Sequence, residues 1–256
     1  MIDQHIEFSI TDRIARIVLA RPTARNAMNA ALITQFAEAC ANAAAGPSLI
    51  AIVISAQGDW FSAGGDLKDF LANREHIHSH VHAMADVLHA AILDLRRAPA
   101  PVIAAVGGVA AGAGFTLVCA CDLVVATQSA RFVSAYTSSG LTPDGGGTFF
   151  LPRIVGHRAA FDIMATNPVL TAAEAKACGI VSRIAEDGAL DSEVDKLLAN
   201  LAAQPEGAVA ALKALFRRGE DGLAAQLDAE RDSIAARAAT PSALARIEAF
   251  LKPKAR

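Results

Sequence analysis

An uncharged run between Arg97 and Asp122 dominates the sequence. It is long enough to cross a bilayer as a helix. However, it begins with Pro99 and Pro101 and is rich in alanine and glycine rather than leucine and phenylalanine. Four glycines interrupt it: Gly107, Gly108, Gly112 and Gly114. The pattern therefore predicts a buried strand over 102–106, a glycine turn and a buried helix, and no membrane span.

Short apolar runs alternate with helical patterns along the first 190 residues. Strands are predicted over 6–10, 14–19, 49–55, 102–106 and 123–126, and helices over 29–44, 75–96 and 113–119. Such alternation is typical of βαβ units, which indicates an α/β fold with a mainly parallel sheet. Later segments are helical only: 191–203, 206–218, 222–237 and 242–251. We therefore expect a core domain over 1–190 and a helical subdomain over 191–256, which packs on the core or on a neighbouring subunit.

Charge and cysteine usage narrow the class of protein. The net charge of −3 argues against nucleic-acid binding, which needs a basic face. The four cysteines show no CxxC pair or zinc spacing, and the N-terminus shows no signal-peptide pattern, so a cytoplasmic protein is expected. The histidines 76, 78, 80 and 82 form two i,i+4 pairs on different helix faces, with no acidic third ligand in register. No metal site is predicted.

Two glycine-rich segments, 61–67 and 107–114, follow the predicted strands 49–55 and 102–106. Ligands bind at the carboxyl ends of parallel strands in α/β sheets. Neither segment is a dinucleotide fingerprint or a phosphate-binding loop. A glycine turn that enters a helix leaves N–H groups unpaired, and two such turns that face one point could form an oxyanion hole. Tight packing of strand on helix explains the glycines equally well.

A third segment, 140–148, places Asp144 between Pro143 and three glycines. The composition predicts an exposed turn in which the neighbours of the carboxylate carry no side chains. The carboxylate could serve chemistry there, or it could cap a helix that starts near Thr148.

The three segments together, in this order, resemble the enoyl-CoA hydratase/isomerase family, also called the crotonase family. Further matches occur over 21–28, 101–106, 121–123, 170–175 and 179–183, so the resemblance covers nearly the whole chain. It implies a crotonase-like fold of repeated ββα units with a C-terminal helical subdomain. It also implies a homotrimer or dimer of trimers that binds acyl-CoA, with coenzyme A entering as part of the substrate and no separate cofactor.

The resemblance assigns roles to residues in the first two segments. The backbone N–H groups of Gly65 and Ala113 would bind the oxygen of a thioester enolate. Ala113 replaces the glycine that is usual in the family, which keeps the N–H and adds a methyl group. The segments around Ala24 and around Ala63, Asp66 and Leu67 would hold the adenine end of CoA.

The resemblance fails at the two catalytic glutamates that the family's hydratases use. At those two positions this chain has Thr116 and Tyr136 instead. Neither side chain is a carboxylate base near neutral pH. Asp144 takes a third position, which some isomerases and the dehalogenases of the family use. We therefore expect an isomerase in which Asp144 moves a proton, acting on an enoyl-CoA or a ring-modified phenylacetyl-CoA. Ordinary hydration of enoyl-CoA is disfavoured.

Two alternatives stay open. A dehalogenase resembling 4-chlorobenzoyl-CoA dehalogenase would use Asp144 as nucleophile and His89 as base, although that family member has Trp where this chain has Tyr136. The second alternative is a paralogue that binds CoA but catalyses no reaction.

The only tryptophan, Trp60, immediately precedes the segment 61–67, and the only tyrosine precedes Asp144 by eight positions. Tyr136 is therefore expected to be a pocket wall or a hydrogen-bond donor.

Overall fold

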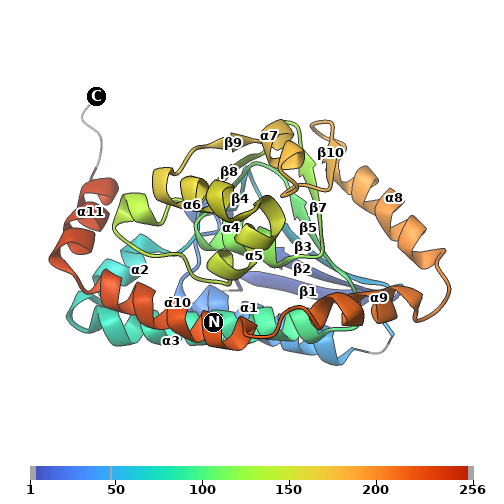
Figure 1. Ribbon diagram of the computed structural model, residues 1–256, viewed down its shortest axis with the longest axis horizontal. Coiled ribbons are helices and arrows are strands. Elements are labelled where there is room, and N and C mark those ends of the chain that lie inside the picture. Colours follow the sequence, from blue (N-terminus) through green and yellow to red (C-terminus); the bar gives the residue numbers. More distant parts are fainter. Residues whose placement is uncertain (1–3, 47, 253–256) are drawn as a thin grey trace.

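The computed structural model describes residues 4–46 and 48–252, and the predicted α/β fold with a mainly parallel sheet is confirmed (Figure 1). Neighbours in the six-stranded sheet follow the order β1 (Ile6–Thr11), β2 (Ile14–Leu19), β3 (Ala51–Ala56), β5 (Val102–Val106), β7 (Leu123–Thr127) and β10 (Arg183–Ala185). Within this sheet β1 and β2 pair antiparallel, around a tight turn. The other neighbours run parallel.

The uncharged run folds as strand and helix within the core. It supplies β5, then β6 (Val109–Ala111), then α4 (Ala113–Ala120). Every residue of β5 and α4 is buried. The small side chains of this run let strand and helix approach closely. Within residues 4–46 and 48–252, no helix is long and apolar enough to cross a membrane.

A second, smaller sheet was not predicted. Its strands are β4 (Trp60–Ser62), β6, β8 (Arg131–Val133) and β9 (Leu170–Thr171), in that order. The segment 107–114 is therefore not a single glycine turn, because its middle forms β6. Likewise, β4 separates β3 from the segment that begins at Ala63. Strands of two or three residues are too short to show a period of two, which is why the sequence did not reveal them.

Helices cover the sheets. They are η1 (Pro22–Ala24), α1 (Ala30–Ala45), α2 (Leu67–Ala72), η2 (Arg74–His76), α3 (Ile77–Arg97), η3 (Thr137–Ser139), α5 (Gly147–Val155), α6 (His157–Thr166) and α7 (Ala172–Ala177). The expected cap of α1 is confirmed, since Asn29 accepts a hydrogen bond from the Leu32 N–H at 2.9 Å. The single helix predicted over 75–96 instead begins as the 3₁₀ turn η2 and becomes α-helical at Ile77.

The chain beyond residue 189 folds as helices α8 (Leu190–Ala202), α9 (Ala208–Arg217), α10 (Leu223–Ala238) and α11 (Pro241–Leu251). Helix α8 packs on the large sheet through Val194 and Leu197, whereas α10 lies along α3 and also contacts α5 (Figure 1). Leu227 and Ile234 of α10 belong to the main hydrophobic core. Helix α10 therefore reaches the same core as the segment that carries Asp144, whereas α8 packs in a separate cluster.

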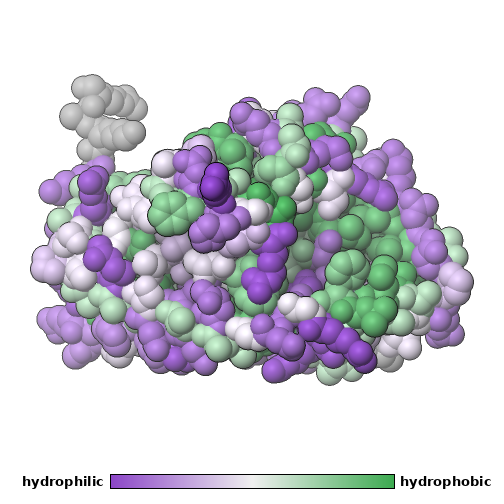
Figure 2. All heavy atoms as spheres, viewed as in Figure 1, coloured by the Kyte–Doolittle hydropathy of each residue, from purple (hydrophilic) through white to green (hydrophobic). Residues whose placement is uncertain are grey.

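Helix α9 also presents apolar side chains to solvent. Leu212, Leu215 and Phe216 are exposed, and Figure 2 shows apolar surface over this part of the molecule, at the lower right of the view. The same helix holds the buried Lys213, whose Nζ lies 2.9 Å from Asp122 and donates to two backbone carbonyls. Helix α9 is thus anchored by a buried ion pair and leaves apolar surface uncovered.

Candidate active site

Strand pairing in the small sheet brings the two glycine-rich segments together. β4 and β6 run parallel, with Trp60 opposite Val109 and Ser62 opposite Ala110. The chain therefore leaves both strands at the same end, into 63–66 and 112–114. The contact is close, because a Cβ on Gly64 would lie 2.9 Å from the Ala111 carbonyl oxygen. Gly64 also has a φ of +87°, which only glycine adopts readily.

Two backbone donors face no acceptor at this junction. Ala113 is the first residue of α4, so its N–H has no partner within the helix. Gly65 lies between Gly64, whose carbonyl accepts from Met28, and Asp66, whose N–H donates to Met28. Across the described ranges, neither the Gly65 nor the Ala113 N–H has a hydrogen-bond acceptor. Adjacent unpaired N–H groups of this kind suit an oxygen that carries negative charge.

Asp144 lies in the turn before α5, and it is not exposed as the sequence suggested. Its exposed fraction is 7%. Its carboxylate accepts a hydrogen bond from the Tyr136 hydroxyl, and that hydroxyl lies 3.3 Å from Thr116 Oγ1. Thr116 is one turn along α4 from Ala113 and donates to the Ala113 carbonyl at 3.2 Å. The side chain of Asp144 does not cap α5; instead, its backbone carbonyl accepts from Gly147.

Burial changes the pKa of the Asp144 carboxyl group. It raises the pKa of Asp144 from 3.8 to about 6, although the hydrogen bond from Tyr136 works in the opposite direction. The same burial, with the neighbouring carboxylate, raises the pKa of Tyr136 well above 10. Tyr136 therefore stays a neutral donor at physiological pH, while Asp144 is a carboxylate that accepts a proton readily.

His89 lies with Asp144 rather than with the residues expected to bind CoA. Its Nε2 accepts a hydrogen bond from the Gly145 N–H at 3.1 Å. Burial lowers the pKa of His89 to about 4, so the ring is neutral and carries its proton on Nδ1. The acceptor nitrogen of the ring is thus already engaged by the backbone. Gly145 has little room, since a Cβ there would lie 2.7 Å from Thr116 Oγ1.

Glu230 of α10 is a buried residue that the sequence analysis missed. Its two carboxylate oxygens accept from the Gly146 N–H at 2.7 Å and the Thr148 N–H at 2.8 Å. Burial raises the pKa of Glu230 to about 7. A signal exists in the sequence: the buried stripe of α10 includes Leu223, Leu227 and Ile234, and a charge interrupts it at position 230. A charged residue in an apolar stripe needs a buried partner.

The four residues expected to hold the adenine end of CoA lie near one another. The Ala63 N–H donates to the Arg25 carbonyl, next to Ala24 at the end of η1. Asp66 caps α2 just before Leu67, accepting from the Lys68 N–H at 3.0 Å. Its other oxygen pairs with Arg21 at 2.6 Å. A surface hollow beside η1 is lined by Gln4, His5, Ala20, Arg21, Pro22, Thr23, Asn29 and Gln57.

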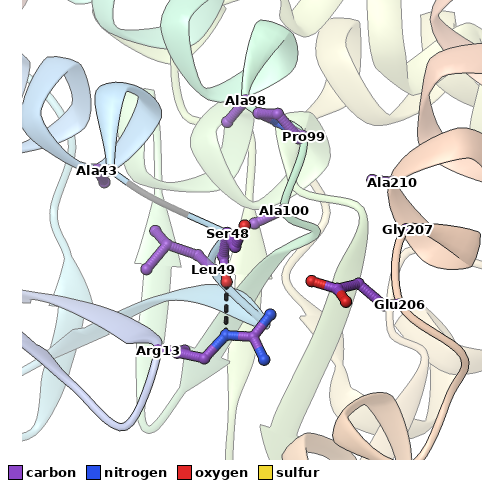
Figure 3. A pocket seen from close by; sticks show the side chains of 11 residues that line it. Arg13, Ala43, Ser48, Leu49, Ala98, Pro99, Ala100, Glu206, Gly207 and Ala210 are labelled. Atoms are coloured by element: carbon purple, nitrogen blue, oxygen red, sulfur yellow. Dashed lines mark hydrogen bonds between the residues drawn. The ribbon is translucent and has the colours of Figure 1, made fainter.

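Two other features lie apart from Asp144. His80 pairs with Asp69 at 2.8 Å, and His82 lies near Asp86 and Asp232. In the described part of the chain, no group of three or more His, Cys, Asp or Glu side chains is arranged so that it could hold a metal ion. Figure 3 shows a pocket where Arg13 faces Glu206 between the ends of α1 and α3 and the start of α9. The residues that line it do not include any of those around Asp144.

Comparison with known proteins gives a consistent result. The family model "Enoyl-CoA hydratase/isomerase" matches residues 9–252. A 4-chlorobenzoyl coenzyme A dehalogenase from Arthrobacter sp is 38% identical over 204 residues, which are 79% of this chain and 74% of that protein. The 1,2-epoxyphenylacetyl-CoA isomerase of Escherichia coli strain K12 is 32% identical over 221 residues, 86% of this chain and 84% of its own.

The fold comparison agrees. A crystal structure of an enoyl-CoA hydratase from Bacillus halodurans superposes with a TM-score of 0.89 and 26% identity, covering 96% of this chain and all of that chain. The expected crotonase-like fold is thereby confirmed. The three proteins carry the names of a dehalogenase, an isomerase and a hydratase, so they share a family rather than one reaction. On these matches and on the fold, the chain belongs to the enoyl-CoA hydratase/isomerase family.

Proposed function

We propose that the protein is an acyl-CoA isomerase in which Asp144 is the general base. The observation that carries this proposal is the buried carboxylate of Asp144, whose pKa of about 6 suits a base at neutral pH. Thr116 and Tyr136, at the positions of the hydratase glutamates, contact each other and cannot replace those carboxylates. The substrate is an enoyl-CoA or a ring-modified phenylacetyl-CoA, as the related isomerase suggests.

In this scheme the thioester oxygen lies between the N–H groups of Gly65 and Ala113. Asp144 removes a proton from the acyl chain, and the electron pair moves onto the thioester oxygen as an enolate. Asp144 then returns the proton to another carbon of the conjugated system, which shifts the double bond. Each N–H donor that meets the developing charge is worth about 3–4 kcal/mol. Coenzyme A enters as part of the substrate, and Tyr136 holds the carboxylate.

A panel of acyl-CoA thioesters in deuterated water, followed by mass spectrometry, tests the proposal. We expect deuterium uptake with double-bond movement, and a fall of about 10²- to 10⁴-fold in Asp144→Asn. Hydration of crotonyl-CoA at a rate that Asp144→Asn leaves unchanged would refute the scheme. Binding of acyl-CoA without any exchange would identify a non-catalytic CoA-binding paralogue instead.

A dehalogenase is the second candidate, and the 38% identity to a 4-chlorobenzoyl coenzyme A dehalogenase favours it. Asp144 would attack the ring carbon that bears the halogen, halide would leave, and water would cleave the resulting ester. The ester cleavage needs a base for water. The acceptor nitrogen of His89 is engaged by the Gly145 N–H, so His89 would have to give up that bond first. For this reason we rank the isomerase above the dehalogenase.

Halide release from 4-chlorobenzoyl-CoA separates the two candidates. A single turnover in ¹⁸O-labelled water would place the label in Asp144 of a dehalogenase, whereas an isomerase acquires none. Release of stoichiometric chloride would overturn the isomerase proposal.

Two properties of the whole protein complete the proposal. We propose a trimer or a dimer of trimers in the cytoplasm, as the family resemblance implies. The uncovered apolar side chains of α9 support self-association. Size-exclusion chromatography with light scattering measures the oligomeric mass, and a monomer would contradict the expectation.

A further inference from the structure

One face of α10 follows the segment that carries Asp144. Polar side chains recur along this helix at intervals of four, three and four residues, which places them on one side: Gln226, Glu230, Ser233 and Arg237. Each of them makes a hydrogen bond to the segment 140–148. Arg237 Nε donates to the Gly140 carbonyl at 3.0 Å, Thr142 donates to Ser233 at 2.9 Å, and Gln226 donates to Thr148 Oγ1 at 2.7 Å.

Glu230 makes the bonds closest to Asp144. It is 4% exposed, and its oxygens accept from Gly146 and Thr148, including the Thr148 hydroxyl. Gly146 is two residues from Asp144, and its backbone adopts a φ of +78° that Glu230 helps to fix. From the other side, His89 of α3 holds the N–H of Gly145. Two helices from distant parts of the chain thus fix consecutive amides of this turn.

We propose that Glu230 is a positioning residue for the proposed reaction: its carboxylate fixes the backbone that carries Asp144. The inference rests on the proposed function for its catalytic consequence. Burial and, to a smaller extent, the charge of Asp144 raise the pKa of Glu230 to about 7. Protonation of Glu230 would leave one oxygen as a weaker acceptor and loosen the turn that carries the base.

Other charged and titratable groups near this pair are few. Tyr136 approaches Asp144 from the segment before η3, and His89 approaches from α3. α4 faces the turn with Thr116, which does not titrate, and Met164 of α6 is apolar. The charges that act on His89 are those of Asp86, Arg231 and Asp228. Glu230 is therefore the buried charge that contacts the turn directly.

Glu230→Gln tests the inference, because it removes the charge and places an amide donor against a backbone N–H. We expect kcat to fall about tenfold to a hundredfold with little change in KM, since the base is misplaced while binding is kept. We also expect the acid limb of the pH profile to move down by about one pH unit, because the variant loses the ionisation of Glu230 at a pKa of about 7 and keeps that of Asp144 at about 6. Glu230→Asp keeps the charge but not the reach, so it should lower kcat and leave the pH limb in place.

Two variants on the same helix are controls. Asp232→Asn removes an exposed charge two residues away, and Ile234→Val weakens the packing of α10 without touching the turn. Neither should change kcat or the pH limb, whatever its effect on stability. Glu230 variants that behave like these controls would overturn the inference.

A second readout does not depend on turnover. Carbon-13 NMR of labelled glutamate carboxyl groups, with Glu230→Gln to assign the signal, follows the titration of Glu230 directly. We expect Asp144→Asn to move that titration to lower pH. If no acyl-CoA reacts with the wild type, the proposed function fails, while this shift would still establish the coupling of the two carboxylates. An unmoved Glu230 titration in a folded Asp144→Asn variant refutes the coupling.

Discussion

Asp144→Asn should change the stability of the protein in a way that depends on pH. The folded protein holds the Asp144 proton up to a pKa of about 6, whereas the unfolded chain loses it near the ordinary pKa of 3.8. Between these values the folded state binds more protons, so wild-type stability falls as pH rises from about 4 to about 6. At about 1.36 kcal/mol for each pH unit between the two pKa values, the loss is on the order of 3 kcal/mol.

Asparagine removes this loss because it carries no charge at any pH. It has nearly the same shape, and its amide oxygen can still accept the hydrogen bond from Tyr136. Its amide N–H₂ adds a donor, which changes stability by an amount that does not depend on pH. The difference between variant and wild type therefore isolates the ionisation of Asp144. Relative to wild type, Asp144→Asn should gain about 2–3 kcal/mol between pH 4 and pH 8.

Urea unfolding provides the measurement, with Trp60 as the only tryptophan and therefore an unambiguous fluorescence probe. Protein concentration is held equal throughout, since association would add to the apparent stability. Asp162→Asn, an exposed acid on α6, is the control for the loss of one negative charge. A difference between Asp144→Asn and wild type that is the same at pH 4 and pH 8 would mean that Asp144 ionises normally, and the case for a buried base would collapse.

Three further results are expected. Tyr136→Phe removes the donor that favours the charged form of Asp144, so the acid limb of activity should move to higher pH, which a pH profile measures. Ala113→Pro removes one N–H at the first position of a helix, where proline is tolerated; kcat should fall about 10²- to 10³-fold with circular dichroism unchanged, and unaltered kcat would exclude this donor. Lys213→Met leaves Asp122 without one of its buried partners and should destabilise the fold by about 3–5 kcal/mol in urea, whereas a neutral effect would show that Arg96 alone suffices.

The features that a short stretch of sequence determines by itself could be predicted from the sequence. The strand 102–106 was predicted at its observed bounds because five successive apolar residues follow a proline and precede two glycines. Asn29 was predicted to be a helix cap because a cap is a local interaction: its side chain accepts a hydrogen bond from Leu32, only three residues along the chain. The family resemblance singled out Thr116, Tyr136 and Asp144, and the structure brings them into contact.

The remaining features depend on contacts between distant segments. Asp144 was expected on an exposed turn because glycine and proline surround it, yet α10 covers that turn. Glu230 is 84 residues from Gly146 in the sequence, so no local pattern connects them. The pairing of β4 with β6 was missed for the same reason, although it brings together the segments that carry Gly65 and Ala113. Each of these features depends on how distant segments pack in the folded chain.

The hydrogen bonds of the Asp144 turn have a consequence for how strong a base this residue can be. A carboxylate just before a helix is usually made more acidic, because the free N–H groups of the first turn stabilise its charge. Here Gly145 donates to His89, and Gly146 and Thr148 donate to Glu230. These side chains occupy N–H groups that could otherwise stabilise the charge of Asp144, whose raised pKa has burial as its main cause. The strength of this base therefore depends in part on α3 and α10, helices that lie far from Asp144 in the sequence.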